Sequence, residues 1–75
     1  MRGISLDATE KLADNWYFEG QLEEKLGNFG HALAAFEKAQ RISPQRHYLE
    51  SIARISKTLG DHRRAYRAEH DLQHP

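Results

Sequence analysis

The sequence contains no cysteine, so no disulfide can stabilise its fold. A chain without cysteine fits a reducing compartment, and we expect a cytoplasmic protein. No stretch reaches the roughly 18 consecutive apolar residues of a transmembrane helix. Residues 1–6 also lack the apolar core of a secretory signal. We therefore expect no membrane partner and no targeting segment at the start of the chain.

The sequence also has no net charge, because 11 Lys and Arg residues balance 11 Asp and Glu residues. The balance is uneven: residues 1–43 carry a net charge of −2, residues 44–75 carry +2, and four of the five His lie in the second part. Without net positive charge, the chain is a poor candidate for electrostatic binding of nucleic acid. Its split charge instead favours head-to-tail contact between copies of the chain.

Motifs for catalysis are also missing: the sequence has no phosphate-binding loop, no nucleophile triad and no cysteine motif. We therefore expect no enzyme and no cofactor. His70 and His74 have the i, i+4 spacing that can hold a metal on one helix face. Because no third ligand motif accompanies them, we interpret both as a solvated tail and expect no metal.

Helical periodicity predicts an all-α chain of four helices with no strand. Asp7 and Glu10 have the spacing of a capping box, which predicts a first helix from about Ala8 to Leu26 after a disordered start at residues 1–6. At about 100° per residue, this helix has an apolar side with two acids inside its arc. That side comprises Ala8, Leu12, Trp16, Leu22 and Leu26, together with Glu19 and Glu23.

The remaining helices are separated by Gly and Pro. Gly27 ends the first helix, and Asn28 is predicted to cap a second helix over Phe29–Arg41. Its apolar stripe consists of Phe29, Ala32, Leu33, Phe36 and Ala39. Ser43 and Pro44 are predicted to open a third helix that reaches Leu59. Asp61 then caps a fourth helix over His62–Gln73.

The segment Trp16–Pro44 resembles one tetratricopeptide repeat, a helix–turn–helix unit of about 34 residues. The matching positions are Trp16, Gly20, Gly27, Asn28, Phe29, Ala32, Phe36, Ala39 and Pro44. Leu59-Gly60-Asp61 repeats Leu26-Gly27-Asn28 and marks a second, weaker copy. The resemblance implies four antiparallel helices in two stacked hairpins: repeat 1 at about 13–45, repeat 2 at about 46–75, and a helical extension at about 7–12. All of 1–75 would then form one domain.

Four positions depart from the family pattern, and one of them is Ser56, which stands where the second repeat should have a Tyr. Glu19 stands where a Leu is expected, Glu23 stands where a Tyr is expected, and Glu69 stands where the first repeat has Phe36. The segment from Gly60 to Ala65 is also loosely similar to repeats in bacterial signalling proteins. Two repeats in 75 residues form a small core. This leaves two alternatives, a fragment of a longer protein or a chain that self-associates.

The family resemblance implies a non-catalytic scaffold for protein–protein interaction, which binds a peptide or helix or else self-associates. Carried over by position, the groove of such a scaffold would use Tyr17, Phe18, Gln21, Lys25, Arg54 and Lys57. The two aromatic residues could instead pack on the N-terminal extension or on another copy. Some family members grip C-terminal carboxylates with Lys and Asn, but Tyr17, Gln21 and Ser51 replace that set here.

The two unusual acids allow two interpretations. Glu19 and Glu23 either lie in water or beside a cation of the same chain, or they contact a second copy through the arginines of the fourth helix. Those arginines are Arg63, Arg64 and Arg67. The same basic helix supports the alternative function, a helical regulator that binds nucleic acid.

Overall fold

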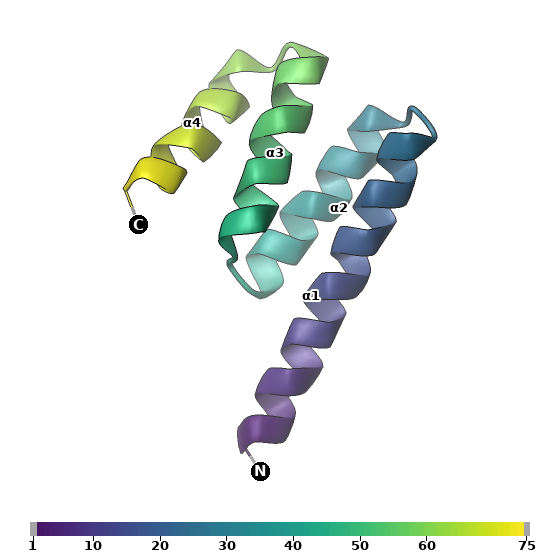
Figure 1. Ribbon diagram of the computed structural model, residues 1–75, viewed down its shortest axis with the longest axis vertical. Helices are drawn as coiled ribbons and strands as arrows, with labels where there is room; N and C mark the ends of the chain where they lie inside the picture. Colours follow the sequence, from purple (N-terminus) through teal and green to yellow (C-terminus); the bar gives the residue numbers. More distant parts are fainter. Residues whose placement is uncertain (1, 75) are drawn as a thin grey trace.

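The computed structural model describes residues 2–74, with side chains from residue 8 onward, and its described part consists of four helices and no strand (Figure 1). The helices are α1 (Arg2–Lys25), α2 (Phe29–Ile42), α3 (Arg46–Leu59) and α4 (His62–Gln73). Each helix packs on the one that follows it in the chain. The predicted all-α architecture of stacked helix hairpins is therefore confirmed.

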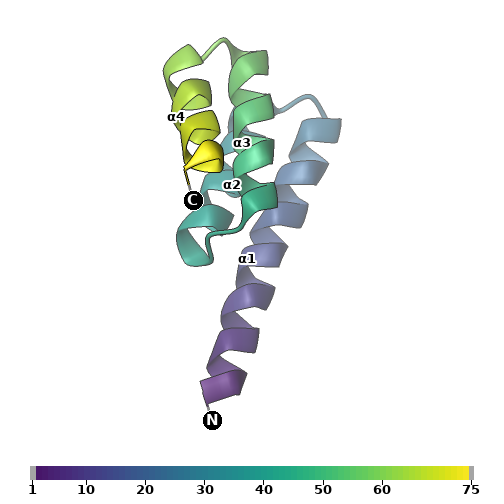
Figure 2. The same cartoon turned by 60° about the vertical axis from the view of Figure 1, so that its left-hand side comes forward.

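Helix α1 is longer than the sequence predicted. It begins at Arg2 rather than at Ala8, so residues 2–6 are helical instead of disordered, and Asp7 lies inside the helix and cannot cap it. Met1 lies outside the described residues. A helix that has already formed can be extended at little cost per residue, which explains why α1 continues beyond the predicted cap. Its N-terminal half extends past the turn between α2 and α3 (Figures 1 and 2).

The two hairpin turns use the predicted glycines. Gly27 and Gly60 have φ angles of 83° and 78°, in the left-handed region where a residue without Cβ is favoured. Asp61 caps α4 as predicted, since its Oδ1 accepts a hydrogen bond from the Arg64 backbone N–H at 3.1 Å. Asn28 stands at the N-cap of α2, but its side chain makes no cap bond, and its Nδ2 donates to Glu23 Oε1 at 2.8 Å.

The predicted start of the third helix is wrong. Ser43 is the C-cap of α2, and α3 begins only at Arg46, with Gln45 as its N-cap. The residue before a proline is biased towards extended backbone, and Ser43 is extended, with φ −148° and ψ 96°. Pro44 therefore lies in the link between the two hairpins and not in the first turn of α3.

The core centres on α2. Of its predicted stripe, Ala32, Leu33, Phe36 and Ala39 are buried, and Phe29 packs against the core while partly exposed. All of them except Ala39 meet α3 and α4 in one cluster that includes Ile52, Ala53, Ile55 and Ala68, whereas Ala39 packs in a second cluster with Ala13 and Tyr48.

The predicted apolar side of the first helix does not face this core. Leu12, Leu22 and Leu26 are 51%, 54% and 65% exposed, whereas Ala13 and Gly20 are buried. Helix α1 thus approaches α2 through its small residues, which leave room for the bulky Phe36 ring of α2. The resulting rotation turns the leucine side of α1 towards solvent.

Candidate protein-binding surface

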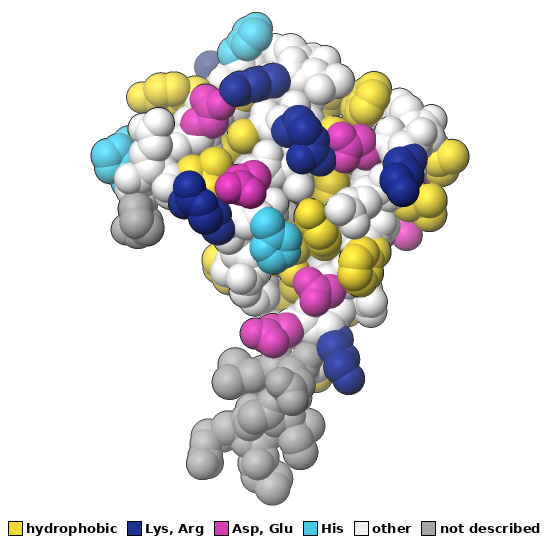
Figure 3. Space-filling view, in the orientation of Figure 1, with side chains coloured by type: hydrophobic (Ala, Val, Ile, Leu, Met, Phe, Trp, Pro, Cys, Tyr) yellow, Lys and Arg dark blue, Asp and Glu magenta, His cyan; other side chains and the backbone are white. Residues whose placement is uncertain are grey.

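The predicted binding residues lie on α1 and α3, and we call the surface of these two helices the α1–α3 face. In Figure 1 these helices lie nearer the viewer than α2, and Figure 3 views the molecule from the same side. Hydrophobic side chains gather there between acidic and basic ones, without a dominant charge of either sign (Figure 3). The face thus offers apolar contact with charged groups at its margins, as protein-binding surfaces do.

Tyr17 forms the floor of this face rather than a free anchor. Its ring centroid lies 5.5 Å from Phe36, 5.1 Å from Tyr48 and 5.0 Å from His47, the last in an edge-on contact. The side chain is half-buried and packs against both core clusters. Phe18 lies beside it, with centroids 6.2 Å apart, and is 61% exposed. Of the two predicted aromatic anchors, Phe18 is therefore the one available to a partner.

A bidentate ion pair joins α1 to α3 on the same face. Arg54 donates from Nη2 to Glu24 Oε1 at 2.7 Å and from Nε to Glu24 Oε2 at 3.1 Å. Hydrogen bonding to Glu24 raises the pKa of the Arg54 guanidinium. Since both side chains are partly exposed, the pair adds little stability, about 0–1 kcal/mol. Its effect is positional, because it fixes where the guanidinium lies and leaves its other N–H donors for a partner.

The remaining predicted residues divide between two directions. Gln21 is partly exposed and Lys25 exposed, and both follow Phe18 on α1 at helical spacing. Lys57 instead forms an ion pair with Glu69, which ties α3 to α4. The α1–α3 face therefore brings together Tyr17, Phe18, Gln21, Lys25 and Arg54, whereas Lys57 contacts α4.

Sequence reasoning missed the role of Tyr48. This side chain is only 1% exposed, and its hydroxyl donates to Asp14 Oδ1 at 2.6 Å, linking α3 to α1 beneath the face. Its ring also lies 4.4 Å from His47. Asp14 and Tyr48 are 34 positions apart, close to one repeat length. That spacing is the one sequence signal that could have paired them.

Burial and the Asp14 carboxylate raise the pKa of Tyr48. The folded state thus favours the neutral Tyr48 hydroxyl. The resulting contribution to the free energy of unfolding is fully present below the ordinary tyrosine pKa of about 10 and is lost as pH rises above it. Tyr48→Phe should lower the free energy of unfolding at neutral pH by about 0.5–1.5 kcal/mol and reduce the alkaline loss of stability. Urea unfolding at neutral and alkaline pH measures both, with the 72% exposed Tyr66 as the Tyr→Phe control. An alkaline profile identical in Tyr48→Phe and wild type would contradict the raised pKa.

The residues predicted for a chain–chain contact are placed on two helices. Glu19 is exposed, and Glu23 is half-buried and accepts the bond from Asn28. On α4, Arg64 forms ion pairs with Glu37 and Asp61. Arg63 and Arg67 have no ion-pair partner within the described part of the chain, and both border a depression that also includes Glu37 of α2. The basic side of α4, on which the nucleic-acid alternative depends, thus lies next to α2.

The geometry also bears on metal binding and on membrane crossing. Within residues 8–74, no three His, Asp or Glu side chains come close enough to hold a metal ion. The His70 and His74 rings lie 4.3 Å apart at the end of α4. None of the described helices combines the length and apolarity needed to cross a membrane.

Comparison with known protein families finds a match for the first hairpin. The family model described as tetratricopeptide repeat matches residues 13–46, which comprise α1 from Ala13 onward, all of α2 and the link to α3. Neither a curated protein nor a solved structure matches the chain. Tetratricopeptide repeats serve in general as protein–protein interaction modules. Residues 13–46 are thus similar to a tetratricopeptide repeat.

Proposed function

We propose that this chain is a non-catalytic scaffold whose α1–α3 face binds a peptide or an amphipathic helix of a partner protein. The observation that carries the proposal is Phe18, an aromatic side chain that is 61% exposed beside a packed floor. Large aromatic residues supply much of the energy in protein interfaces, especially where their surroundings are already ordered.

The floor beneath Phe18 supports a preorganised site. Tyr17 is held by rings from α2 and α3, and the Glu24–Arg54 pair links α1 to α3 close by. A partner would therefore order few side chains of this surface when it binds, which lowers the entropic cost of association.

The charges around Phe18 favour a partner with both apolar and acidic groups. Lys25 is exposed and has no ion-pair partner within the described residues, and Arg54 keeps free N–H donors beside Glu24. An apolar side chain on Phe18 with a carboxylate directed to Lys25 or Arg54 would satisfy both features.

The proposal treats residues 1–75 as one cytoplasmic domain with two repeats, at about 13–45 and 46–75. The support is the pair of left-handed glycines, Gly27 and Gly60, which end the first helix of each hairpin at equivalent positions. The absence of cysteine supports the cytoplasmic location.

Selection from a display library of random peptides tests the proposal, because it requires no identified partner. Selection on the immobilised chain should enrich peptides that combine an apolar or aromatic residue with Asp or Glu. Titration of the enriched peptides should show that Phe18→Ala weakens binding by about tenfold or more.

Tyr66→Ala is the matched control, because Tyr66 is also an exposed aromatic residue but lies on α4. It should leave the affinity of the selected peptides unchanged. Failure to enrich any peptide, or equal effects of Phe18→Ala and Tyr66→Ala, would overturn the proposal.

A further inference from the structure

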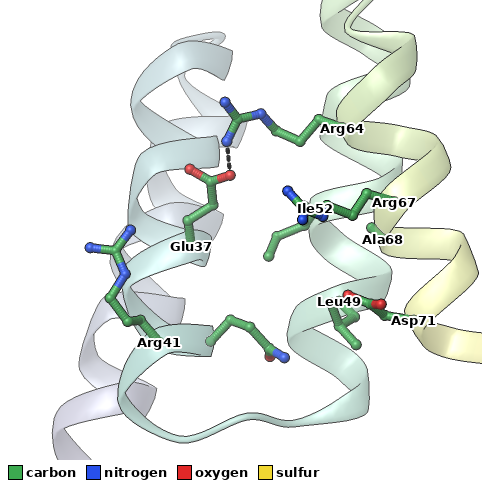
Figure 4. A pocket seen from close by; sticks show the side chains of 9 residues that line it. Glu37, Arg41, Leu49, Ile52, Arg64, Arg67, Ala68 and Asp71 are labelled. Carbon is green, nitrogen blue, oxygen red and sulfur yellow. Dashed lines mark hydrogen bonds and ion pairs between the residues drawn. The ribbon is translucent and has the colours of Figure 1, made fainter. Parts of the chain in front are cut away.

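Helix α2 sits over a depression formed by the second hairpin. The depression has a volume of about 360 Å³ and lies between α2, α3 and α4 (Figure 4). Helices α3 and α4 contribute Leu49, Ile52, Arg64, Arg67, Ala68 and Asp71. Helix α2 covers one side of it with Glu37, Gln40 and Arg41, and Glu37 bonds to Arg64 across the gap (Figure 4).

The first hairpin has a corresponding surface. Its residues lie 33 positions earlier in the sequence, the spacing that separates Leu26 from Leu59. A second depression of about 220 Å³ lies on α1 and α2. The counterparts of the six residues contributed by α3 and α4 all line it, namely Trp16, Glu19, His31, Ala34, Ala35 and Lys38. We call this surface the α1–α2 seat. Within the described chain, no helix covers it as α2 covers the second hairpin.

Because no helix covers the α1–α2 seat, residues of the first hairpin are more exposed than their counterparts in the second hairpin. Ile55 is 0% exposed beneath α2, whereas its counterpart Leu22 is 54% exposed. Ile52 is buried at 5%, whereas its counterpart Glu19 faces solvent. The exposed apolar side of α1 is therefore the side that a helix equivalent to α2 would bury, with an acid near its centre.

Helix α4 is the positional equivalent of α2, and its corresponding side is uncovered. Leu33 of α2 is 8% exposed against α3, whereas Tyr66, its counterpart on α4, is 72% exposed. His70 and His74 occupy the positions of Glu37 and Arg41. Their rings continue from Tyr66 along the helix, with successive centroids 6.1 Å and 4.3 Å apart. Tyr66, His70 and His74 thus form an aromatic ridge on the outer side of α4.

We infer that the occupant of the α1–α2 seat is α4 of a second copy of this chain. The interface between α2 and α3 within one chain is the template, because Leu33 and Ile55 share one core cluster there. Their counterparts, Tyr66 of one copy and Leu22 of the next, meet in the same way. Glu19 then lies among His70, Gln73 and His74, whose side chains can donate hydrogen bonds to its carboxylate.

Charge supports the head-to-tail direction of this contact. Residues 1–43 carry −2 and residues 44–75 carry +2, so opposite charges meet when the second hairpin of one copy approaches the first hairpin of another. Arg63 and Arg67 lie on the side of α4 towards its own α2, so the histidines rather than these arginines face Glu19. The two surfaces differ, so the contact is heterologous and each copy in a dimer leaves one surface for a further copy.

Engineered disulfides test the contact directly, because the chain contains no cysteine of its own. Leu22→Cys and Tyr66→Cys are prepared as two separate variants and oxidised alone and as a mixture. Neither variant alone should form covalent dimers, and the mixture should. A chain with both substitutions should form a ladder of covalent oligomers.

A matched control uses Phe18→Cys, because Phe18 is 61% exposed on α1, against 54% for Leu22, but lies on the α1–α3 face. Mixed with Tyr66→Cys, it should remain monomeric. Dimers from either single variant alone would indicate a two-fold symmetric contact and overturn the inference. Absence of dimers in the mixture, or equal dimer formation by the Phe18→Cys control, would also overturn it.

Sedimentation velocity of the chain without engineered cysteines gives an independent readout. Its average mass should rise with concentration beyond that of the dimer, because a heterologous contact leaves a surface for a third copy. Leu22→Ser should weaken association by about tenfold or more, while Phe18→Ser should leave it unchanged. A monomer at all concentrations, or equal effects of the two variants, would contradict the inference.

Discussion

Phe36→Ala is expected to lower the free energy of unfolding by about 3–5 kcal/mol. A small domain has about 5–15 kcal/mol in total, and usually near the lower end, so the variant should keep little or no stability. The Phe36 side chain is 0% exposed and belongs to the cluster that joins α2 to α3 and α4. Its ring also meets Tyr17 and Gly20 of α1. The substitution thus removes a fully buried ring that packs on α1 and belongs to the core cluster shared with α3 and α4.

Urea unfolding followed by circular dichroism measures this loss. Phe18→Ala is the matched control, because it removes the same ring from a site that is 61% exposed and should change stability by only about 0.5 kcal/mol. A loss below about 1 kcal/mol for Phe36→Ala would mean that the ring is not central to the core.

Gly20→Ala is expected to destabilise the chain, although Ala is the better helix former by about 1 kcal/mol. A Cβ at Gly20 would lie 2.6 Å from Phe36 Cε1 and 2.7 Å from Phe36 Cδ1. The ring is fully buried, so overpacking should cost about 1–3 kcal/mol and exceed the gain in propensity.

Gly30→Ala provides the matched comparison. Gly30 also lies in a helix, but a Cβ there would meet nothing within 4 Å. This variant should therefore gain up to about 1 kcal/mol. Thermal or urea unfolding of both variants gives the comparison, and the idea of a close α1–α2 approach fails if Gly20→Ala is stabilised as much as Gly30→Ala.

The number of helices and their turns were predictable because the chain marks them with local signals. Gly27, Gly60 and Asp61 each act through their own backbone or side chain, so their roles can be recognised before the fold is known. The stripe of α2 was predictable for a similar reason, since its apolar residues fall on one side of the helix.

The packed side of α1 was not predictable in the same way. Its apolar residues are spread around the helix, so periodicity alone does not select one face. The large leucines of α1 suggested that their side packs on α2. The close approach of Phe36 instead requires a small residue, and this residue is Gly20, on another side of α1. The partner helix therefore decided the rotation, and the α1 sequence did not contain that information.

The binding surface was partly predictable. Family positions selected Phe18 and Arg54, and both lie on the α1–α3 face. What could not be predicted was the pairing of side chains across helices, such as Tyr48 with Asp14 or Arg54 with Glu24. Such pairs depend on rotations and distances that are set only when the hairpins pack.

The central claim is that the two hairpins stack through Phe36, and NMR contacts between its ring protons and neighbouring protons test it most directly. We predict contacts from the Phe36 ring both to the α-protons of Gly20 on α1 and to the methyl groups of Ile52 or Ile55 on α3. Contacts to α1 alone, with none to α3, would mean that the hairpins do not stack and would contradict the account.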